Sequence, residues 1–129
     1  MLISEEGNRK LQYAGAHNPL YIIRNGELLE FKGDPMHIGA MNKTDKSFRN
    51  RVVELKENDM VYLFTDGYYD QIGGPKDRKF MRKNFKKMLE RMAPLPVENQ
   101  KDEINIIYEV WRGSNKQVDD ILILGFRVV

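Results

Sequence analysis

The stretch "MVYLFTDGYYD", residues 60–70, decides the fold that the rest of the sequence can adopt. It begins with an uninterrupted apolar run, which is typical of a central strand that is covered on both faces. Thr65, Asp66 and Gly67 follow directly, and a second carboxylate, Asp70, lies four positions after the first. The stretch therefore predicts a buried strand that ends in an acidic turn.

Further strand signals precede this stretch. Lys10–Ala16 alternates loosely between apolar and polar residues, and Pro19–Phe31 contains two β-rich runs around an Asn-Gly pair, which is a strong hairpin signal. Phe48–Leu55 comes next and is joined to the run at Met60–Asp66 by a polar turn. The first half of the chain is therefore expected to form antiparallel strands.

The pattern then changes to helical spacing. Apolar residues recur at intervals of three and four between Asp77 and Met92 and again between Val97 and Arg112, which predicts two amphipathic helices. Asp119–Val129 is apolar enough to form a final strand. This order predicts an α+β fold, with two helices against one face of a mostly antiparallel sheet.

The composition indicates a globular protein without disulfides. The chain has 129 residues, of which 41% are hydrophobic and 31% are charged. The net charge of +2 is too small to indicate nucleic-acid binding by itself, and the absence of cysteine excludes thiolate metal ligands. No apolar run approaches the roughly 20 residues that cross a membrane. We expect a cytoplasmic protein, with any membrane part elsewhere in a longer chain.

Acidic residues mark the ends of two apolar runs. Asp66 ends the run that begins at Met60, and Asp119 and Asp120 open the run that ends at Val129. If these strands pair antiparallel, Asp66 and Asp119 converge at one sheet edge. Close carboxylates repel each other unless a proton or cation bridges them, and Mg²⁺ and Mn²⁺ prefer oxygen ligands. Two interpretations stay open, a divalent metal site and an ordinary polar turn.

Four motifs follow one another along the chain: "YAGAHNPLYIIRNGEL", "IGA", "LKENDMVYLFTDGYYDQIGG" and "QVDDILIL". In this order they resemble the SpoIIE-like group of metal-dependent serine/threonine protein phosphatases. None is specific alone, but the set, from about Leu11 to Val129, resembles the C-terminal half of that catalytic domain. The resemblance implies a β-sandwich flanked by helices, of which this chain would form a partial sandwich.

The resemblance also implies roles for the acids. Asp66 and Asp119 would be metal ligands. Asp70 lies where some relatives have an acid for a third, weaker metal. Asp120 is either a further ligand or a residue that holds the loop.

The implied chemistry is metal-assisted hydrolysis with two Mn²⁺ or Mg²⁺ ions per complete site. A water activated between the ions attacks the phosphoserine phosphorus in line. Thr65 and Gly67 would support the geometry of the ligands.

The family's catalytic domain is roughly twice as long as this chain. Its N-terminal half supplies an early Asp and a glycine-rich Asp-Gly loop, and that signature is absent here: Asp34-Pro35 and Asp59-Met60 have the wrong context. We therefore expect residues 1–129 to form an incomplete domain with about half a metal site and little or no activity alone. Exposed sheet edges predict a homodimer or a swapped strand.

Two other features have competing interpretations. The first predicted helix and its approach are basic. A solvated outer face is the favoured interpretation, and docking of an acidic or phosphate-bearing partner, of nucleic acid or of an anionic membrane surface is the alternative. The basic residues are Lys76, Arg78, Lys79, Arg82, Lys83, Lys86, Lys87 and Arg91. His17 has two interpretations, a residue that approaches the metal site and a turn residue that bonds to backbone, and the second is favoured. His37 lies in a loop and is given no role.

The leading functional hypothesis is hydrolysis of phosphoserine or phosphothreonine on a regulatory protein, as the output of a bacterial sensor. In relatives the substrate is often an anti-anti-sigma factor, an expectation that rests on the resemblance alone. The alternative is a non-catalytic docking module that binds a protein partner. The retained Asp66 and Asp119 favour the enzyme, and we expect no nucleic-acid partner.

Overall fold

The computed structural model describes residues 2–5, 8–13, 19–31 and 51–129. Its elements, in chain order, are β1 (Leu2–Glu5), β2 (Asn8–Tyr13), β3 (Leu20–Arg24), β4 (Glu27–Phe31), β5 (Arg51–Leu55), β6 (Met60–Phe64), β7 (Ile72–Gly73), β8 (Arg78–Lys79), α2 (Arg82–Met92), α3 (Val97–Arg112) and β9 (Ile123–Arg127).

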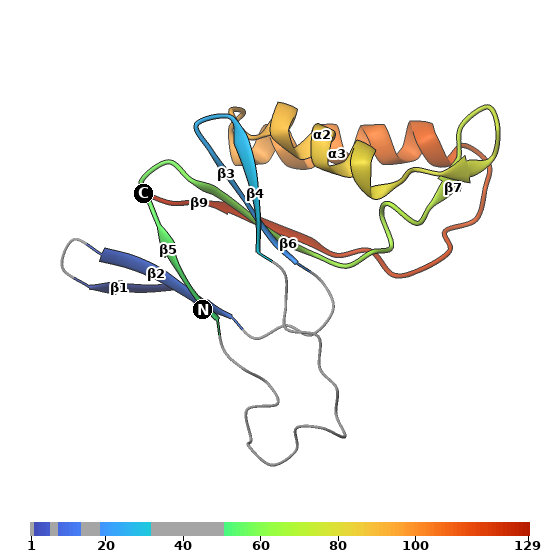
Figure 1. Ribbon diagram of the computed structural model, residues 1–129. Helices are drawn as coiled ribbons and strands as arrows, with labels where there is room; N and C mark the ends of the chain where they lie inside the picture. The colour runs from blue at the N-terminus through green and yellow to red at the C-terminus, as the bar shows by residue number, and fades with distance from the viewer. Residues whose placement is uncertain (1, 6–7, 14–18, 32–50) are drawn as a thin grey trace, which may run out of the picture.

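The strands form two main sheets and a small hairpin. One sheet has the order β1-β2-β5, a larger one has the order β4-β3-β6-β9, and β7 pairs with β8. Every described strand pair is antiparallel. Both helices lie along one face of the larger sheet (Figure 1). The predicted α+β class, with two helices on one face of an antiparallel sheet, is therefore confirmed.

Strand β6 lies inside the larger sheet and is buried on both faces. On the helix side, Tyr62 and Phe64 belong to a core cluster that includes Phe85 of α2. On the opposite side, Val61 packs in a second cluster with Val53 of β5. The second sheet thus covers the face that the helices leave free, which gives the layers of a partial sandwich. The expected doubly buried strand is confirmed.

Helix α3 has the predicted bounds, whereas α2 begins later than predicted. The expected helix started at Asp77, but α2 starts at Arg82 because two backbone features prevent an earlier start. Arg78 pairs with Gly73 in the β7–β8 hairpin, and Met81 has a φ of 82°, which is outside the right-handed helical region. The helix-like spacing of apolar residues thus extends into a segment that forms the β7–β8 hairpin, which is why the predicted start was too early.

The strand boundaries also differ from the prediction. Strand β2 begins at Asn8 and β1 was not predicted. Strand β9 begins at Ile123, so Asp119 and Asp120 lie in the loop that leads to it rather than in the strand. The predicted hairpin around the Asn-Gly pair is confirmed, because β3 and β4 pair with Arg24 opposite Glu27.

A buried ion pair fixes the turn before β6. Asp59 is 1% exposed and accepts hydrogen bonds from Arg24 Nε at 2.9 Å and Arg24 Nη2 at 2.7 Å. The amide of Lys56 donates a third bond to the same carboxylate at 2.8 Å. This bidentate geometry connects β3 to the β5–β6 turn.

Neither of the two described helices combines the length and the apolar character that a membrane span needs.

Candidate metal centre

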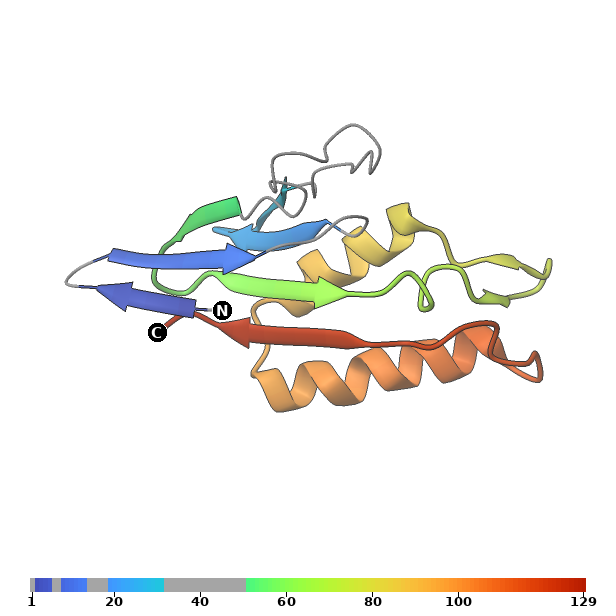
Figure 2. The same cartoon turned by 90° about the horizontal axis from the view of Figure 1, so that it is seen from below.

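Pairing of β6 with β9 brings the two acidic segments to the same end of the sheet. Phe64 lies opposite Ile123, and the ladder continues beyond both strands, where the amide of Thr65 donates to Leu122 O at 2.9 Å. Figure 2 shows the two strands side by side, running in opposite directions. The turn that starts at Asp66 therefore meets the loop that contains Asp119.

Thr65 and Gly67 hold these two segments in close contact. The Thr65 hydroxyl donates to Asp120 O at 3.2 Å and accepts from the Leu122 amide at 3.0 Å. Gly67 passes so close to the same carbonyl that a Cβ atom at position 67 would lie 2.2 Å from Asp120 O. Only a residue without a side chain fits there, because two backbones share the space.

Two buried tyrosines anchor the acidic turn to the helix layer. The Tyr68 hydroxyl donates to Ile104 O of α3 at 2.8 Å, and the Tyr68 ring packs against Phe85 at a centroid distance of 5.5 Å. Burial raises the pKa of Tyr68, so its hydroxyl stays protonated and remains a donor. Tyr69 packs on the same Phe85 ring at 5.3 Å. These contacts with α2 and α3 therefore fix the position of the turn on the helix layer.

The four predicted aspartates all lie at this end of the molecule, with different surroundings. Asp66 is exposed, and its carbonyl accepts a hydrogen bond from the Asp70 amide at 3.0 Å, so the two residues lie one helical turn apart. Asp70 is half-buried, with Oδ1 3.7 Å from Lys79 Nζ. Asp119 and Asp120 are exposed, and the Asp120 amide donates to Asp119 Oδ1 at 2.7 Å.

The donor set suits a hard divalent cation, because every predicted ligand is a carboxylate. Within the ranges described by the structure, no group of three or more His, Asp or Glu side chains could hold a metal ion. The acids present therefore fit as part of a site whose coordination needs additional donors. His17, His37 and Asp34 lie outside the described residues.

A groove of about 590 Å³ runs beside this end of the sheet, between α3 and β9. Tyr62, Ile104 and Leu124 line its apolar part, and Gln117 and Leu122 belong to its rim. None of the four aspartates lines it. The groove is therefore a neighbour of the acidic end and does not enclose it.

Sequence reasoning missed Gln71, a fully buried polar residue immediately after Asp70. Its side chain connects the acidic turn to the loop before β9, and the amide nitrogen donates to Lys116 O at 2.8 Å. The only sequence signal was one amide residue between two tyrosines and two glycines. That signal does not distinguish a buried residue with several hydrogen-bond partners from a turn residue on the surface.

The fold matches those of known phosphatase structures. The SiaA-PP2C domain of Pseudomonas aeruginosa matches with a TM-score of 0.80 and 36% sequence identity, over 93% of this chain and 47% of that one. The phosphatase domain of the cell fate determinant SpoIIE from Bacillus subtilis matches with a TM-score of 0.56 and 17% identity, over 99% and 56%. The catalytic domain of PstP, solved with two manganese ions, has a TM-score of 0.56 and 14% identity, over 99% and 57%.

These matches define the class of the fold, which is that of PP2C phosphatase domains. The sequence profile of the family described as Stage II sporulation protein E (SpoIIE) matches residues 1–129. The chain belongs to the SpoIIE family, as its ordered motifs indicated. It spans about half the length of the solved domains that it matches, with 47% of the SiaA-PP2C domain covered. A search of curated proteins found no match.

The close contact at Gly67 predicts the effect of adding one methyl group. Gly67→Ala should force the acidic turn away from Asp120, at a cost of about 1–3 kcal/mol in the free energy of unfolding, because the obstructing atom belongs to the backbone. Chemical denaturation measures the cost, and backbone NMR shifts of Thr65 and Leu122 report the displacement.

Gly26→Ala is the control for this variant. Gly26 has a φ of 81°, so alanine is strained there, but no described atom beyond its two chain neighbours lies within 4 Å of the added Cβ. It should destabilise the β3–β4 hairpin without moving the resonances of Thr65 and Leu122. Unchanged Leu122 shifts in Gly67→Ala would contradict the proposed contact.

Proposed function

We propose that this chain is part of a metal-dependent protein phosphatase that hydrolyses phosphoserine or phosphothreonine on a regulatory protein. The observation that supports the proposal is the pairing of β6 with β9, which brings the turn with Asp66 and the loop with Asp119 to the same end of the sheet in a chain of the SpoIIE family. Asp70 and Asp120 lie beside them. In this proposal Asp66 and Asp119 hold Mn²⁺ or Mg²⁺, and Asp70 and Asp120 assist.

Each element of the acidic end has a defined task in this proposal. Bound divalent ions would supply an activated water and neutralise the phosphate oxygens. Asp66 lies in the turn after β6 and Asp119 in the loop before β9, and Tyr68 and Tyr69 anchor that turn to the helix layer. Asp66 and Asp119 are exposed, so a metal ion bound to them could also bind donor groups from outside the described residues. A complete site would take those ligands from the half of the matched domains that this chain does not span.

The proposed cellular role is that of an output domain inside a bacterial cell. The chain would act in the cytoplasm, as part of the output of a bacterial sensor, where the absence of cysteine suits reducing conditions. The family resemblance makes an anti-anti-sigma factor the substrate to test first. The alternative function, a non-catalytic docking module, would use the same surfaces without turnover.

Metal titration tests the central claim. The 129-residue chain should bind Mn²⁺ weakly, and Asp66→Asn and Asp119→Asn should each lower the affinity about tenfold or more, because affinity depends on the number of charged ligands. Calorimetry or Mn²⁺-induced broadening of amide resonances measures this. Asp102→Asn, an exposed acid on α3, is the matched control and should bind as the unmodified chain does.

Turnover separates the enzyme from the docking module. The chain alone should not hydrolyse a phosphoserine peptide, whereas a longer protein that contains it should do so with Mn²⁺ and should lose activity with Asp66→Asn. Robust turnover by the chain alone would show that its own residues suffice and would contradict the incomplete site. A longer protein that binds the peptide without turnover would favour docking.

Helix α2 offers a surface for the phosphorylated partner. Lys83, Lys87 and Arg91 are exposed and lie at four-residue intervals, so they form one stripe; we call it the basic stripe. Among the residues that the structure describes, they make no ion pair, whereas Lys86 binds Glu30 at 2.8 Å. Like charges at this spacing repel, so the stripe is stabilised when an anion binds. The Met81 amide, next to α2, donates to Tyr69 O at 2.9 Å, so the helix starts beside the acidic turn.

Charge reversal tests the basic stripe. The double variant Lys83→Glu/Lys87→Glu should weaken binding of an acidic phosphoserine peptide about tenfold and reduce its salt dependence, because each rim charge contributes roughly 0.5–1 kcal/mol. Fluorescence anisotropy at two salt concentrations measures both effects. Lys101→Glu, exposed on α3, is the control. An equal loss with Lys101→Glu would show a general charge effect and reject the stripe as the docking surface.

The edge of β9 supports the homodimer proposal. Among the described strands β9 pairs only with β6; Leu124 of β9 and Leu122, which precedes the strand, are 53% and 62% exposed. An apolar edge strand is a template for pairing with a second copy. Sedimentation velocity should show a dimer that Leu124→Lys converts to a monomer. A monomer at all concentrations would reject this proposal.

A further inference from the structure

Gln71 occupies the junction between the two acidic segments. It follows Asp70 directly, precedes β7, and is 0% exposed. A buried amide that lacks partners destabilises a protein, so the contacts of this side chain show what its position requires.

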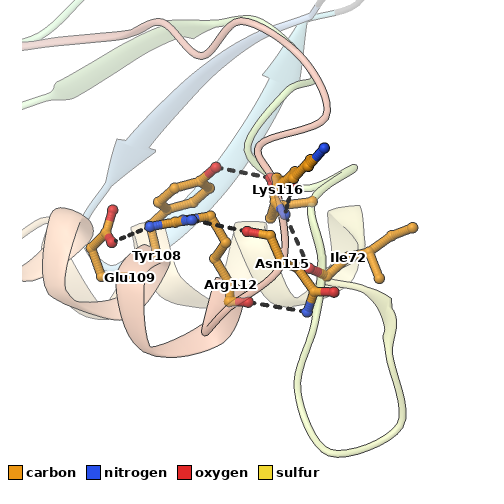
Figure 3. A network of polar contacts seen from close by, with 7 residues as sticks. Ile72, Tyr108, Glu109, Arg112, Asn115 and Lys116 are labelled. Carbon is orange, nitrogen blue, oxygen red and sulfur yellow. Dashed lines mark hydrogen bonds and ion pairs between the residues drawn. The ribbon is translucent and has the colours of Figure 1, made fainter.

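The side chain of Gln71 has a full set of hydrogen bonds. Its Nε2 donates to Ile72 O at 3.0 Å and to Lys116 O at 2.8 Å. Its Oε1 accepts from the Tyr108 hydroxyl at 2.8 Å and from the Val118 amide at 3.3 Å. Two donors and two acceptor positions are thus used, which is the capacity of an amide. Three of these partner residues, Ile72, Tyr108 and Lys116, are drawn in Figure 3.

Backbone contacts fix Gln71 itself. Its carbonyl accepts from Trp111 Nε1 at 2.9 Å and from the Phe80 amide at 2.9 Å. The adjacent Gly73 packs so tightly on α3 that a Cβ atom would lie 1.9 Å from Trp111 O. Gln71 is therefore attached to the C-terminal end of α3, which is a rigid support.

The segment that leaves α3 is also ordered by side chains as it approaches Gln71. Arg112 Nη1 donates to Asn115 O at 2.9 Å, and Arg112 Nη2 binds Glu109 Oε2 at 2.8 Å. The Asn115 amide group donates back to Arg112 O at 3.1 Å. These bonds, drawn in Figure 3, close the turn after the helix and direct residues 116–120 toward Gln71.

We propose that Gln71 is a positioning residue that holds the 116–120 loop, with Asp119 and Asp120, against the turn that carries Asp66 and Asp70. Its two loop partners, Lys116 and Val118, lie within three residues of Asp119. Thr65 fixes the far side of the same loop through Asp120 O. One side chain on each side thus restrains the segment. The consequence for metal binding rests on the proposed function, whereas the restraint itself does not.

The test replaces Gln71 with Met, which has similar length and no hydrogen-bonding amide. In Gln71→Met, the ¹⁵N order parameters of Asp119 and Asp120 should fall from values typical of rigid backbone, about 0.85, to below about 0.6. Exchange of the Val118 amide should become faster by a factor on the order of ten, because its acceptor is lost. Amides of β6 should keep their protection. Unchanged order parameters and Val118 exchange would overturn the proposal.

Gln100→Met is the matched control. Gln100 is also a buried glutamine bonded to a tyrosine hydroxyl, that of Tyr62, and its Nε2 donates to Leu95 O at 2.9 Å. It lies at the opposite end of α3, so its loss should destabilise the fold without mobilising Asp119. Equal mobility at Asp119 in both variants would show a general loss of stability and would overturn the assignment to Gln71.

Tyr108→Phe decides the outcome if Gln71→Met does not fold. It removes one bond to Gln71 Oε1 and should give a smaller loss of order at Asp119. Unchanged order there would overturn the proposal. Mn²⁺ broadening at Asp66 and Asp119 of the unmodified chain tests the proposed function separately. If broadening is absent, the metal site fails while the order parameters still decide the role of Gln71.

Discussion

The antiparallel pairing of β6 with β9 is the constraint on which the rest of the structure depends. It joins a central strand to a strand that returns after two helices. It therefore adds the last strand of the larger sheet and determines where both acidic segments lie. The pairing continues past the strands through Thr65, whose amide and hydroxyl bind Leu122 and Asp120. Backbone contact at Gly67 then leaves no room for a change of register. A slip by one residue would exchange the buried and exposed faces of β9 and separate the acids.

The acidic end combines exposed charge with buried support. Asp66 and Asp119 remain in contact with solvent, so their charges avoid the cost of desolvation. Tyr68 in the same turn and Gln71, which binds the loop with Asp119, are buried and hydrogen-bonded. This division allows a rigid arrangement of carboxylates, which metal sites and catalytic sites require, without an unpaired charge in the core.

The chain belongs to the SpoIIE family but spans about half of the solved domains that it matches. The SiaA-PP2C domain matches 93% of this chain, but the match covers 47% of that domain. The larger sheet and both helices are nevertheless well packed, because the aromatic cluster around Phe85 joins α2 to β6. The surface that is less well covered lies along β9, at Leu122 and Leu124. The sheet is thus packed against α2 through the aromatic cluster, whereas the groove between α3 and β9 and the edge of β9 stay open.

The sequence by itself determined the class of the fold, the bounds of α3, the β3–β4 hairpin and the burial of β6, because each follows from local periodicity or turn chemistry. It also identified the acids, and the ordered motifs indicated the family. Tertiary structure alone decided the start of α2, where the β7–β8 hairpin and the positive φ of Met81 override an apolar pattern that reads as helix. It also decided the role of Gln71, whose partners Tyr108 and Lys116 lie 37 and 45 residues away in the chain. Local sequence reports the preferences of neighbouring residues, whereas such contacts arise only when separate segments pack together.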